Sequence, residues 1–162
     1  MKKLNFGCGK DIRKDYVNVD IVRLKGVDKA FDFEKFPYPF KNEEFDLIEA
    51  HQVLEHIENF LPCMEELYRI LKLNGKIILD VPYWLSFDSW AHPQHKRAFT
   101  FETFDFFVEG TKRYEKDGRC FNFRFRKINK RFIFGKRFNL IGCIAEPLFN
   151  MFPNFYEKMT FL

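Results

Sequence analysis

Two glycines and one aspartate near the start of the chain have the types and spacing of a nucleoside site. Gly7 and Gly9 follow the apolar run Leu4–Phe6, and Asp20 follows the short run Val17–Val19. Glycine allows tight turns and lets a ligand approach the backbone closely. A carboxylate at the carboxyl end of a neighbouring parallel strand can accept both hydroxyls of a ribose. The pattern therefore predicts an adenosine-type ligand, although Asp20 could instead cap a turn.

Two phosphate-binding motifs fit this turn poorly. A dinucleotide fingerprint needs a third glycine where Ile12 stands, and its acidic residue comes about 20 residues on, later than Asp20. A P-loop needs Ser or Thr after its lysine, but Asp11 follows Lys10. The sequence thus favours a ligand with an adenosine and no pyrophosphate.

The elements that must position these residues alternate along the first half of the chain. A helix is predicted between Asn59, a candidate N-cap, and the stop signal Asn74-Gly75, because apolar residues recur at helical spacing from Phe60 to Leu71. Strands separated by helical or loop crossovers indicate a parallel sheet. The predicted strands are residues 4–8, 17–21, 30–33, 45–50 and 76–81.

The second half of the chain has a different character. Residues 82–99 form a connection too long for an idle loop in a compact domain. Thr100 is predicted to cap a short helix over 101–108, and the alternation in 121–134 predicts a β-hairpin. Residues 146–162 form an amphipathic, Phe-rich tail, which we expect to favour self-association.

Bulk properties indicate one globular domain in a reducing compartment. The chain has 162 residues, a net charge of +4 and four scattered cysteines without a C-x-x-C pair. Free thiols fit this pattern better than disulfides. The first strand begins almost at the N-terminus, and no apolar run reaches the roughly 20 residues that span a bilayer. We therefore expect a cytoplasmic protein without a signal peptide or a transmembrane segment.

Two later motifs make the pattern specific. Gln52–Ile57 reads QVLEHI and Leu71–Gly75 reads LKLNG. Together with the glycine turn and Asp20, in this order, they resemble class I S-adenosylmethionine-dependent methyltransferases, in particular the small type 11-like branch with an LEHI motif. The resemblance covers roughly the first 82 residues. It implies an α/β fold, a three-layer Rossmann-like open sheet that is mostly parallel and either lacks its terminal antiparallel strand or takes it from the hairpin.

The resemblance also assigns a cofactor and a domain plan. S-adenosylmethionine is the expected cofactor of a single domain, with residues 1–82 binding it and residues 83–162 facing the acceptor. Asn5 stands where many members carry an acidic residue, and Asp11 where many carry a third glycine. The cofactor-binding residues implied are Asn5, Gly7, Cys8, Gly9, Asp20, Ile21, Asp32, Phe33 and His51.

The acceptor side follows the fifth strand in such proteins. Tyr83, Trp84, His95 and Arg97 are the implied acceptor-side residues, and His56 and His95 are the candidate catalytic residues. His95 and Arg97 could equally anchor the loop to backbone carbonyls. The sulfonium already activates the methyl group, so a base is needed only for an acceptor such as a hydroxyl. A small-molecule or saccharide-type acceptor is the leading expectation.

Two other functions remain open. Basic residues interleaved with aromatics in 112–137 could bind nucleic acid, or could be a solvated strand face. Methylation of exocyclic base amines is disfavoured, because residues 49–52 read EAHQ where those enzymes carry an Asn/Asp-Pro-Pro-aromatic motif. The chain could also be a cofactor-binding but inactive partner subunit. We expect no metal, because His51, His56, His92 and His95 lack a known zinc spacing.

Overall fold

The computed structural model describes residues 1–126, 129–133, 146–147 and 150–151. It divides into two compact units, residues 1–99 and residues 100–162. The functional division of a single domain at residue 82 stays a prediction.

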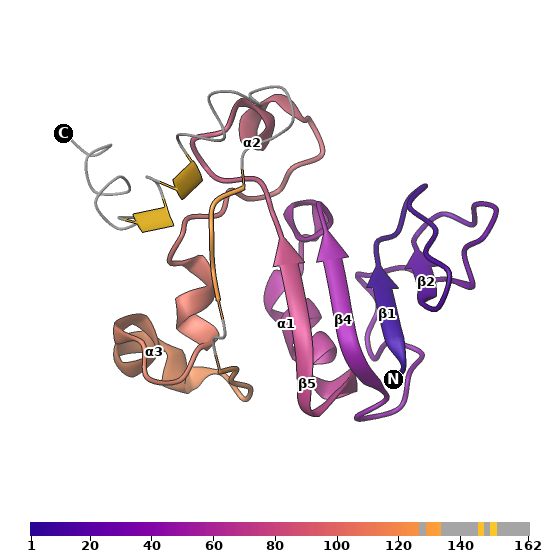
Figure 1. Ribbon diagram of the computed structural model, residues 1–162, viewed down its shortest axis with the longest axis horizontal. Coiled ribbons are helices and arrows are strands. Elements are labelled where there is room, and N and C mark those ends of the chain that lie inside the picture. The colour runs from indigo at the N-terminus through magenta and orange to yellow at the C-terminus, as the bar shows by residue number, and fades with distance from the viewer. Residues whose placement is uncertain (127–128, 134–145, 148–149, 152–162) are drawn as a thin grey trace. The chain divides into compact units, whose positions relative to one another are not determined.

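The first unit contains a parallel sheet of five strands (Figure 1). The strands are β1 (Lys3–Phe6), β2 (Val17–Asp20), β3 (Lys29–Ala30), β4 (Phe45–His51) and β5 (Leu71–Asp80). Their order across the sheet is β3-β2-β1-β4-β5. The chain moves outward from β1 to β3 and then returns to the other side of β1, so the order reverses between β1 and β4. This arrangement confirms the predicted open, mostly parallel α/β fold.

The two faces of the sheet differ in polarity because side chains alternate along each strand. Pairing places Leu4 beside Val17 and Ile48, and Phe6 beside Val19 and Ala50. All of these except Val17 are buried, so this face belongs to the core. The opposite face carries polar residues from three strands, listed by strand as Asn5, Asn18, Glu49 and His51.

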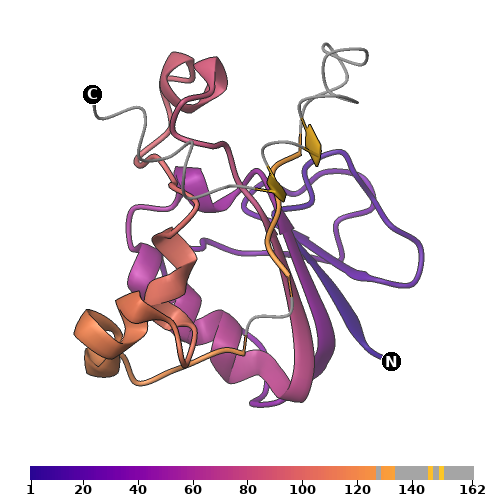
Figure 2. The ribbon, with the colours of Figure 1, turned by 60° about the vertical axis from the view of Figure 1, so that its left-hand side comes forward.

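Helix α1 (Phe60–Ile70) covers the apolar face of the sheet (Figure 2). Its buried apolar residues follow a helical period, as predicted: Phe60, Cys63, Met64, Leu67 and Ile70. Tyr38 connects the layers, because its ring lies 5.7 Å from that of Phe6 and its backbone N–H donates to Glu66 of α1. The helix ends at Ile70, earlier than predicted. Asn74 and Gly75 lie inside β5, where Asn74 takes a positive φ of 63°.

The second unit contains short helices, and the predicted hairpin is wrong for the part that can be described. The helices are η2 (Thr103–Phe107), α3 (Lys112–Asp117) and η3 (Gly118–Cys120). Residues 121–126 and 129–133 contain no strand; Phe125 forms only an isolated parallel bridge with Val108. Aromatic packing explains this, since Phe107 lies about 5 Å from the rings of Phe121 and Phe123.

Two further expectations concern cysteines and membranes. Cys8, Cys63 and Cys120 are free, as predicted, whereas Cys143 lies outside the described residues. Among the described residues, no helix combines the length and the apolar character needed to cross a bilayer. Most of the Phe-rich tail lies outside the described residues, so self-association through it stays a prediction.

Candidate functional site

The glycine turn lies at the carboxyl end of β1, as the sequence predicts. Gly7 and Gly9 have φ values of 71° and 51°, a region that favours glycine. The Cys8 backbone N–H donates to the Val19 carbonyl at 2.9 Å, which extends the β1–β2 pairing into the turn. The turn is therefore held against the end of β2.

Asp20 stands at the end of β2 and binds this turn directly. One carboxylate oxygen accepts from the Gly9 N–H at 2.7 Å, and the other accepts from the Val22 N–H at 3.0 Å. A carboxylate has about four acceptor positions, so these bonds leave capacity for further donors. Asp20 therefore acts as a cap and also presents a carboxylate beside the turn.

The two glycines face different surroundings. A Cβ at Gly7 would lie 2.4 Å from Cγ2 of Val53, so the glycine turn packs against the segment that follows β4. A Cβ at Gly9 would meet nothing within 4 Å. The ends of β1 and β4 flank the reversal of strand order, the place where open α/β sheets bind ligands. The open space beside Gly9 and Asp20 thus lies where the sequence predicts an adenosine-containing ligand.

Asp32 and Phe33 follow β3 at the same edge of the sheet. Asp32 Oδ1 accepts from the Glu34 N–H at 3.0 Å, which forms a local turn. Phe33 is buried and stacks on Phe6 with ring centroids 4.2 Å apart. Both residues lie where the resemblance places them, and their contact with adenine stays a prediction. Ile21, just after Asp20, is 58% exposed and thus accessible to a ligand.

Asn5 is buried beneath the β1–β2 connection. Its Nδ2 donates to the Asp11 carbonyl at 2.7 Å and to Asn18 Oδ1 at 3.1 Å. These bonds give it a structural role at a position expected to bind cofactor. Its neighbour in the turn, Cys8, is also buried; burial and then the Asp20 carboxylate raise the pKa of its thiol to about 11, so it stays protonated.

His51 belongs to a polar cluster that sequence reasoning missed. Its Nε2 lies 2.9 Å from Glu49 Oε2, and its Nδ1 lies 3.5 Å from Asp80. Glu49 also accepts from Arg13 and, at 2.6 Å, from the Tyr16 hydroxyl. Burial opposes ionisation of Glu49, but the bonds from Tyr16, His51 and Arg13 together lower its pKa to about 2. The sequence signal that could have revealed this cluster is the alternation along β4, which places Glu49 and His51 on the same face of the strand.

The LEHI motif forms a short turn after β4. Helix η1 (Leu54–His56) buries Leu54 and Glu55, and His56 is half-buried. Glu55 is 1% exposed, and neither carboxylate oxygen has a hydrogen-bond partner. Burial raises the pKa of Glu55. Burial, and then the neighbouring His95 and His92, lower the pKa of His56, which favours its neutral imidazole.

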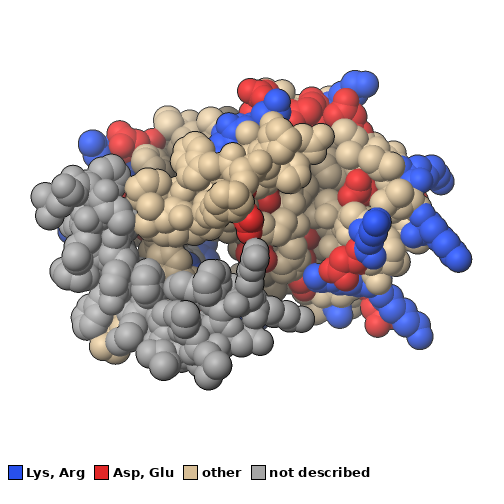
Figure 3. Space-filling model, turned by 90° about the horizontal axis from the view of Figure 1, so that it is seen from above, with Lys and Arg blue, Asp and Glu red and all other residues tan. Residues whose placement is uncertain are grey.

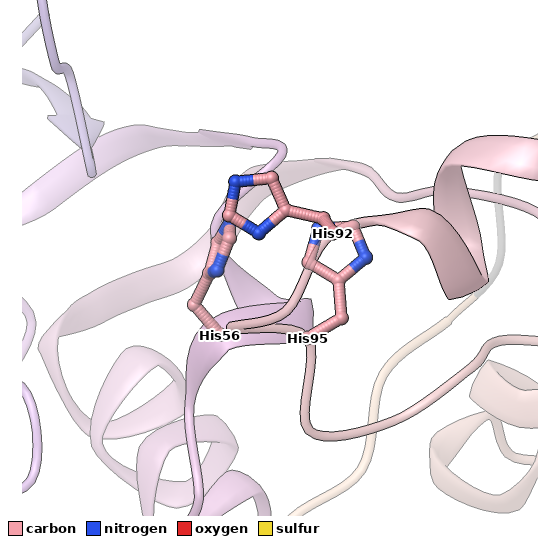
Figure 4. Close-up of side chains that lie close together, drawn as sticks. All are labelled: His56, His92 and His95. Carbon is pink, nitrogen blue, oxygen red and sulfur yellow. The ribbon is translucent and has the colours of Figure 1, made fainter.

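The connection after β5 returns to this turn. It contains helix α2 (Phe87–Ala91), capped by Ser86, and then brings His92 and His95 next to His56 (Figure 4). The His95 ring centroid lies 4.7 Å from that of His56. The structure therefore brings together the two predicted catalytic histidines and a third.

The other acceptor-side residues have structural contacts. Arg97 Nη2 donates to the carbonyls of Ile57 at 3.0 Å and Glu58 at 2.6 Å, and its guanidinium lies over the Phe60 ring. Tyr83 forms an isolated bridge with Phe99, and its carbonyl accepts from the Ser89 hydroxyl. The Trp84 backbone N–H donates to the Phe99 carbonyl. These bonds support loop anchoring for Arg97, one of the two roles considered for it.

Comparison with known proteins finds similarity to a methyltransferase domain within the first unit. Residues 8–79 match a protein family described as a methyltransferase domain. An uncharacterized protein of Methanocaldococcus jannaschii is 38% identical over 80 residues, which are 49% of this chain and 38% of that protein. A second one from the same organism is 34% identical over 89 residues, covering 48% of this chain and 39% of that protein. The match thus spans about two fifths of the length of these relatives.

Solved structures share the fold at low sequence identity. A SAM-dependent methyltransferase from Archaeoglobus fulgidus superposes with a TM-score of 0.55 and 18% identity, over 91% of this chain and 79% of that one. A chain from the complex between the Haloferax volcanii Trm112 methyltransferase activator and a methyltransferase gives 0.54 and 13%, over 83% and 65%. Residues 8–79 therefore match a methyltransferase domain, and the strand order and the shared fold agree with the fold of class I S-adenosylmethionine-dependent methyltransferases.

Proposed function

We propose that this chain transfers a methyl group from S-adenosylmethionine to a small-molecule or saccharide-type acceptor by in-line displacement. The observation that carries the proposal is the open space beside Gly9, next to the Asp20 carboxylate, at the reversal of strand order. When bound, the cofactor supplies an activated methyl group. The residues fit it, because a side chain at position 9 would occupy the space that a nucleoside needs.

Each predicted residue then has a separate task. Asp20 accepts from the ribose hydroxyls with the acceptor positions that Gly9 and Val22 leave open. Asp32 and the Phe33 backbone hold the adenine edge. His51 is assigned to the methyl-donor side of the pocket. Orientation of the acceptor, rather than a strong base, supplies most of the rate enhancement. Good alignment can lower the activation barrier by about 7–11 kcal/mol.

His56 and His95 are the proposed catalytic residues for a hydroxyl acceptor. His56 is held neutral by burial and by its histidine neighbours, so it can accept a proton near neutral pH. His95 Nδ1 lies 3.2 Å from the Ser89 carbonyl, which favours a proton on Nδ1 and leaves Nε2 as an acceptor. Tyr83 and Trp84 are assigned to the wall of the acceptor pocket.

Contacts in the second unit weigh against nucleic acid as the acceptor. Three of its basic residues already face carboxylates: Lys130 with Asp105 at 2.7 Å, Arg113 with Glu102 at 2.6 Å and Arg124 with Glu109 at 3.6 Å. In the view of Figure 3, Lys/Arg and Asp/Glu side chains also lie next to one another on the surface. Paired cations release fewer counterions on binding phosphates, so they contribute less to affinity.

Release of S-adenosylhomocysteine during incubation with acceptors tests this function. We expect turnover with a hydroxylated small molecule or saccharide, and loss of turnover in Asp20→Asn. Glu65→Gln, an exposed change on α1, is the matched control and should retain full turnover. Methylation of RNA with a steep salt dependence would instead support the nucleic-acid alternative. Binding of cofactor without turnover on any acceptor would support an inactive partner subunit.

A further inference from the structure

Three imidazoles lie together beside the turn that follows β4 (Figure 4). His56 comes from η1, and His92 and His95 come from the loop after α2. One ring nitrogen of each lies within 4.8 Å of the others. The His92 and His95 rings stack at 4.8 Å, and the His56 ring lies 5.1 Å from His92 and 4.7 Å from His95. Residues far apart in sequence thus offer three nitrogen ligands at one point.

We propose that His56, His92 and His95 bind a divalent transition-metal ion of the zinc type. Imidazole is a common ligand of such ions, and three histidines form a known zinc ligand set. A tetrahedral zinc with Zn–N distances of 2.0–2.1 Å places its ligand nitrogens about 3.4 Å apart. The present separations require the ring nitrogens to approach one another by up to about 1.4 Å. His92 is exposed on its loop, so it can make this movement without disturbing the core.

The surroundings already orient part of the ligand set. His95 Nδ1 faces the Ser89 carbonyl at 3.2 Å, an outer contact that fixes a metal-binding imidazole with Nε2 free. His92 Nδ1 accepts only a long bond of 3.3 Å from the Gln94 N–H. Binding through His92 Nε2 moves the ring proton to Nδ1 and gives up that contact. The loop itself is held beside η1, because the Lys96 N–H donates to the Glu55 carbonyl at 2.7 Å.

Glu55 supplies a second, independent observation. Its side chain is 1% exposed, and neither carboxylate oxygen has a hydrogen-bond partner. A buried carboxylate without partners is costly unless a positive charge compensates it. Glu55 directly precedes His56 in the chain. A dication held by the three imidazoles would stabilise the ionised form of this carboxylate.

Three protein ligands leave one position open, which is the pattern of catalytic rather than structural zinc sites. That position can take a water molecule or a hydroxyl oxygen of an acceptor, and coordination makes such an oxygen easier to deprotonate. The ion would also fasten the loop after α2 to η1. The ion would take over the activation of the hydroxyl from His56 and His95, because an imidazole bound to a metal no longer accepts a proton. The site uses none of the residues assigned to the cofactor, so cobalt binding tests it separately.

Cobalt binding followed by visible absorption tests the proposal on the full-length, chelator-stripped protein. We expect one Co²⁺ per chain with the intense visible bands of a tetrahedral site, displacement by Zn²⁺, and a rise in melting temperature with Zn²⁺. His92→Ala and His95→Ala should each weaken binding by more than about tenfold. His51→Asn is the control, because it removes the remaining histidine and leaves the cluster intact.

Several outcomes would overturn the proposal. Far-ultraviolet circular dichroism first establishes that each variant is folded, and the exposed His92 is the change least able to disturb folding. Equal cobalt binding by the wild-type chain and a folded His92→Ala/His95→Ala double variant would contradict it. So would the near-ultraviolet charge-transfer band of a thiolate ligand, which would assign the ion to cysteines, or the absence of binding at millimolar cobalt.

Discussion

Gly7 and Gly9 lie in one turn but have different roles. Gly7 allows close packing, and Gly9 leaves space for a ligand. Both need a positive φ, which costs an alanine about 1–2 kcal/mol. Only at Gly7 would the added Cβ also collide with Val53, at 2.4 Å, and overpacking adds about 1–3 kcal/mol. We predict that Gly7→Ala lowers the free energy of unfolding by about 2–5 kcal/mol, whereas Gly9→Ala lowers it by about 1–2 kcal/mol.

For ligand binding, the expected order of the two alanine variants is the reverse of their order for loss of stability. The Cβ of Gly9→Ala would enter the open space, so we predict that folded Gly9→Ala loses most of its affinity for S-adenosylhomocysteine. Urea unfolding and calorimetry on both variants measure the two effects. Unchanged affinity in Gly9→Ala would show that this space is not the ligand site.

Glu49 makes stability depend on pH. Its pKa of about 2 lies below the roughly 4.3 of an unfolded glutamate, so its contribution is present above pH 4.3 and is lost as pH falls through 2. The contribution at pH 7 is about 3 kcal/mol. We predict that Glu49→Gln is less stable than the wild type by up to about this amount at pH 7, and that the difference shrinks toward pH 2. Urea unfolding at pH 7, 5 and 3 measures it, and a difference that does not change with pH would contradict the proposed network.

At the scale of single residues, the sequence predicts arrangements between residues that are close together in the chain. Gly7, Gly9 and Asp20 lie where expected, because a strand, a turn and the next strand fix their relation within a few residues. The convergence of His56 with His92 and His95 depends on how a long loop returns, which no short-range pattern encodes. The expectation of no metal rested on sequence spacing alone, and a metal ion at this cluster is a proposal.

Among the elements, the loop after β5 has a side-chain anchor in Arg97, in addition to its backbone hydrogen bonds. Arg97 donates to the carbonyls of Ile57 and Glu58 and lies 4.9 Å over the Phe60 ring. Lysine lacks the planar guanidinium that lies over the ring while its Nη2 donates both bonds. We predict that Arg97→Lys increases hydrogen exchange in residues 83–95 while β1 and β4 stay protected, at a cost of about 1–3 kcal/mol. Hydrogen exchange with mass spectrometry measures this.

Kinetics distinguish the two roles considered for Arg97. A pure anchor should leave cofactor affinity unchanged in Arg97→Lys, whatever happens to the loop. If residues 83–95 keep wild-type exchange while the KM for the acceptor rises, Arg97 contacts the acceptor instead.

Element types could be predicted better than element ends. The apolar period of α1 and the runs of β1, β2 and β4 gave the sheet and its covering helix. The end of α1 was misplaced because β5 begins directly at Leu71 and carries Asn74 and Gly75 within it. The hairpin failed because Phe121 and Phe123 pack on Phe107, a contact that alternation cannot reveal.

For the whole molecule, the family match and the fold agree while the acceptor remains a proposal. The matched residues, 8–79, contain β2 to β4 and α1, Gly9 of the glycine turn, and all of β5 except Asp80. On the polar face of the sheet, Arg13 and Tyr16 from the β1–β2 connection pair with Glu49. The amino-acid composition does not predict these contacts. The connections formed by residues 7–16 and 21–28 contain no helix. Side chains from a loop, rather than a helix, therefore lie on the polar face of the sheet.

Calorimetric titration of the full-length chain with S-adenosylhomocysteine tests the central claim most directly. We predict binding of one molecule with micromolar affinity, a loss of more than about tenfold in Asp20→Asn, and no change in the control Glu65→Gln. Loss of an acceptor for the ribose hydroxyls, worth about 1–3 kcal/mol, accounts for the expected loss. Absence of binding by the folded wild-type chain, or equal affinity in folded Asp20→Asn, would contradict the account.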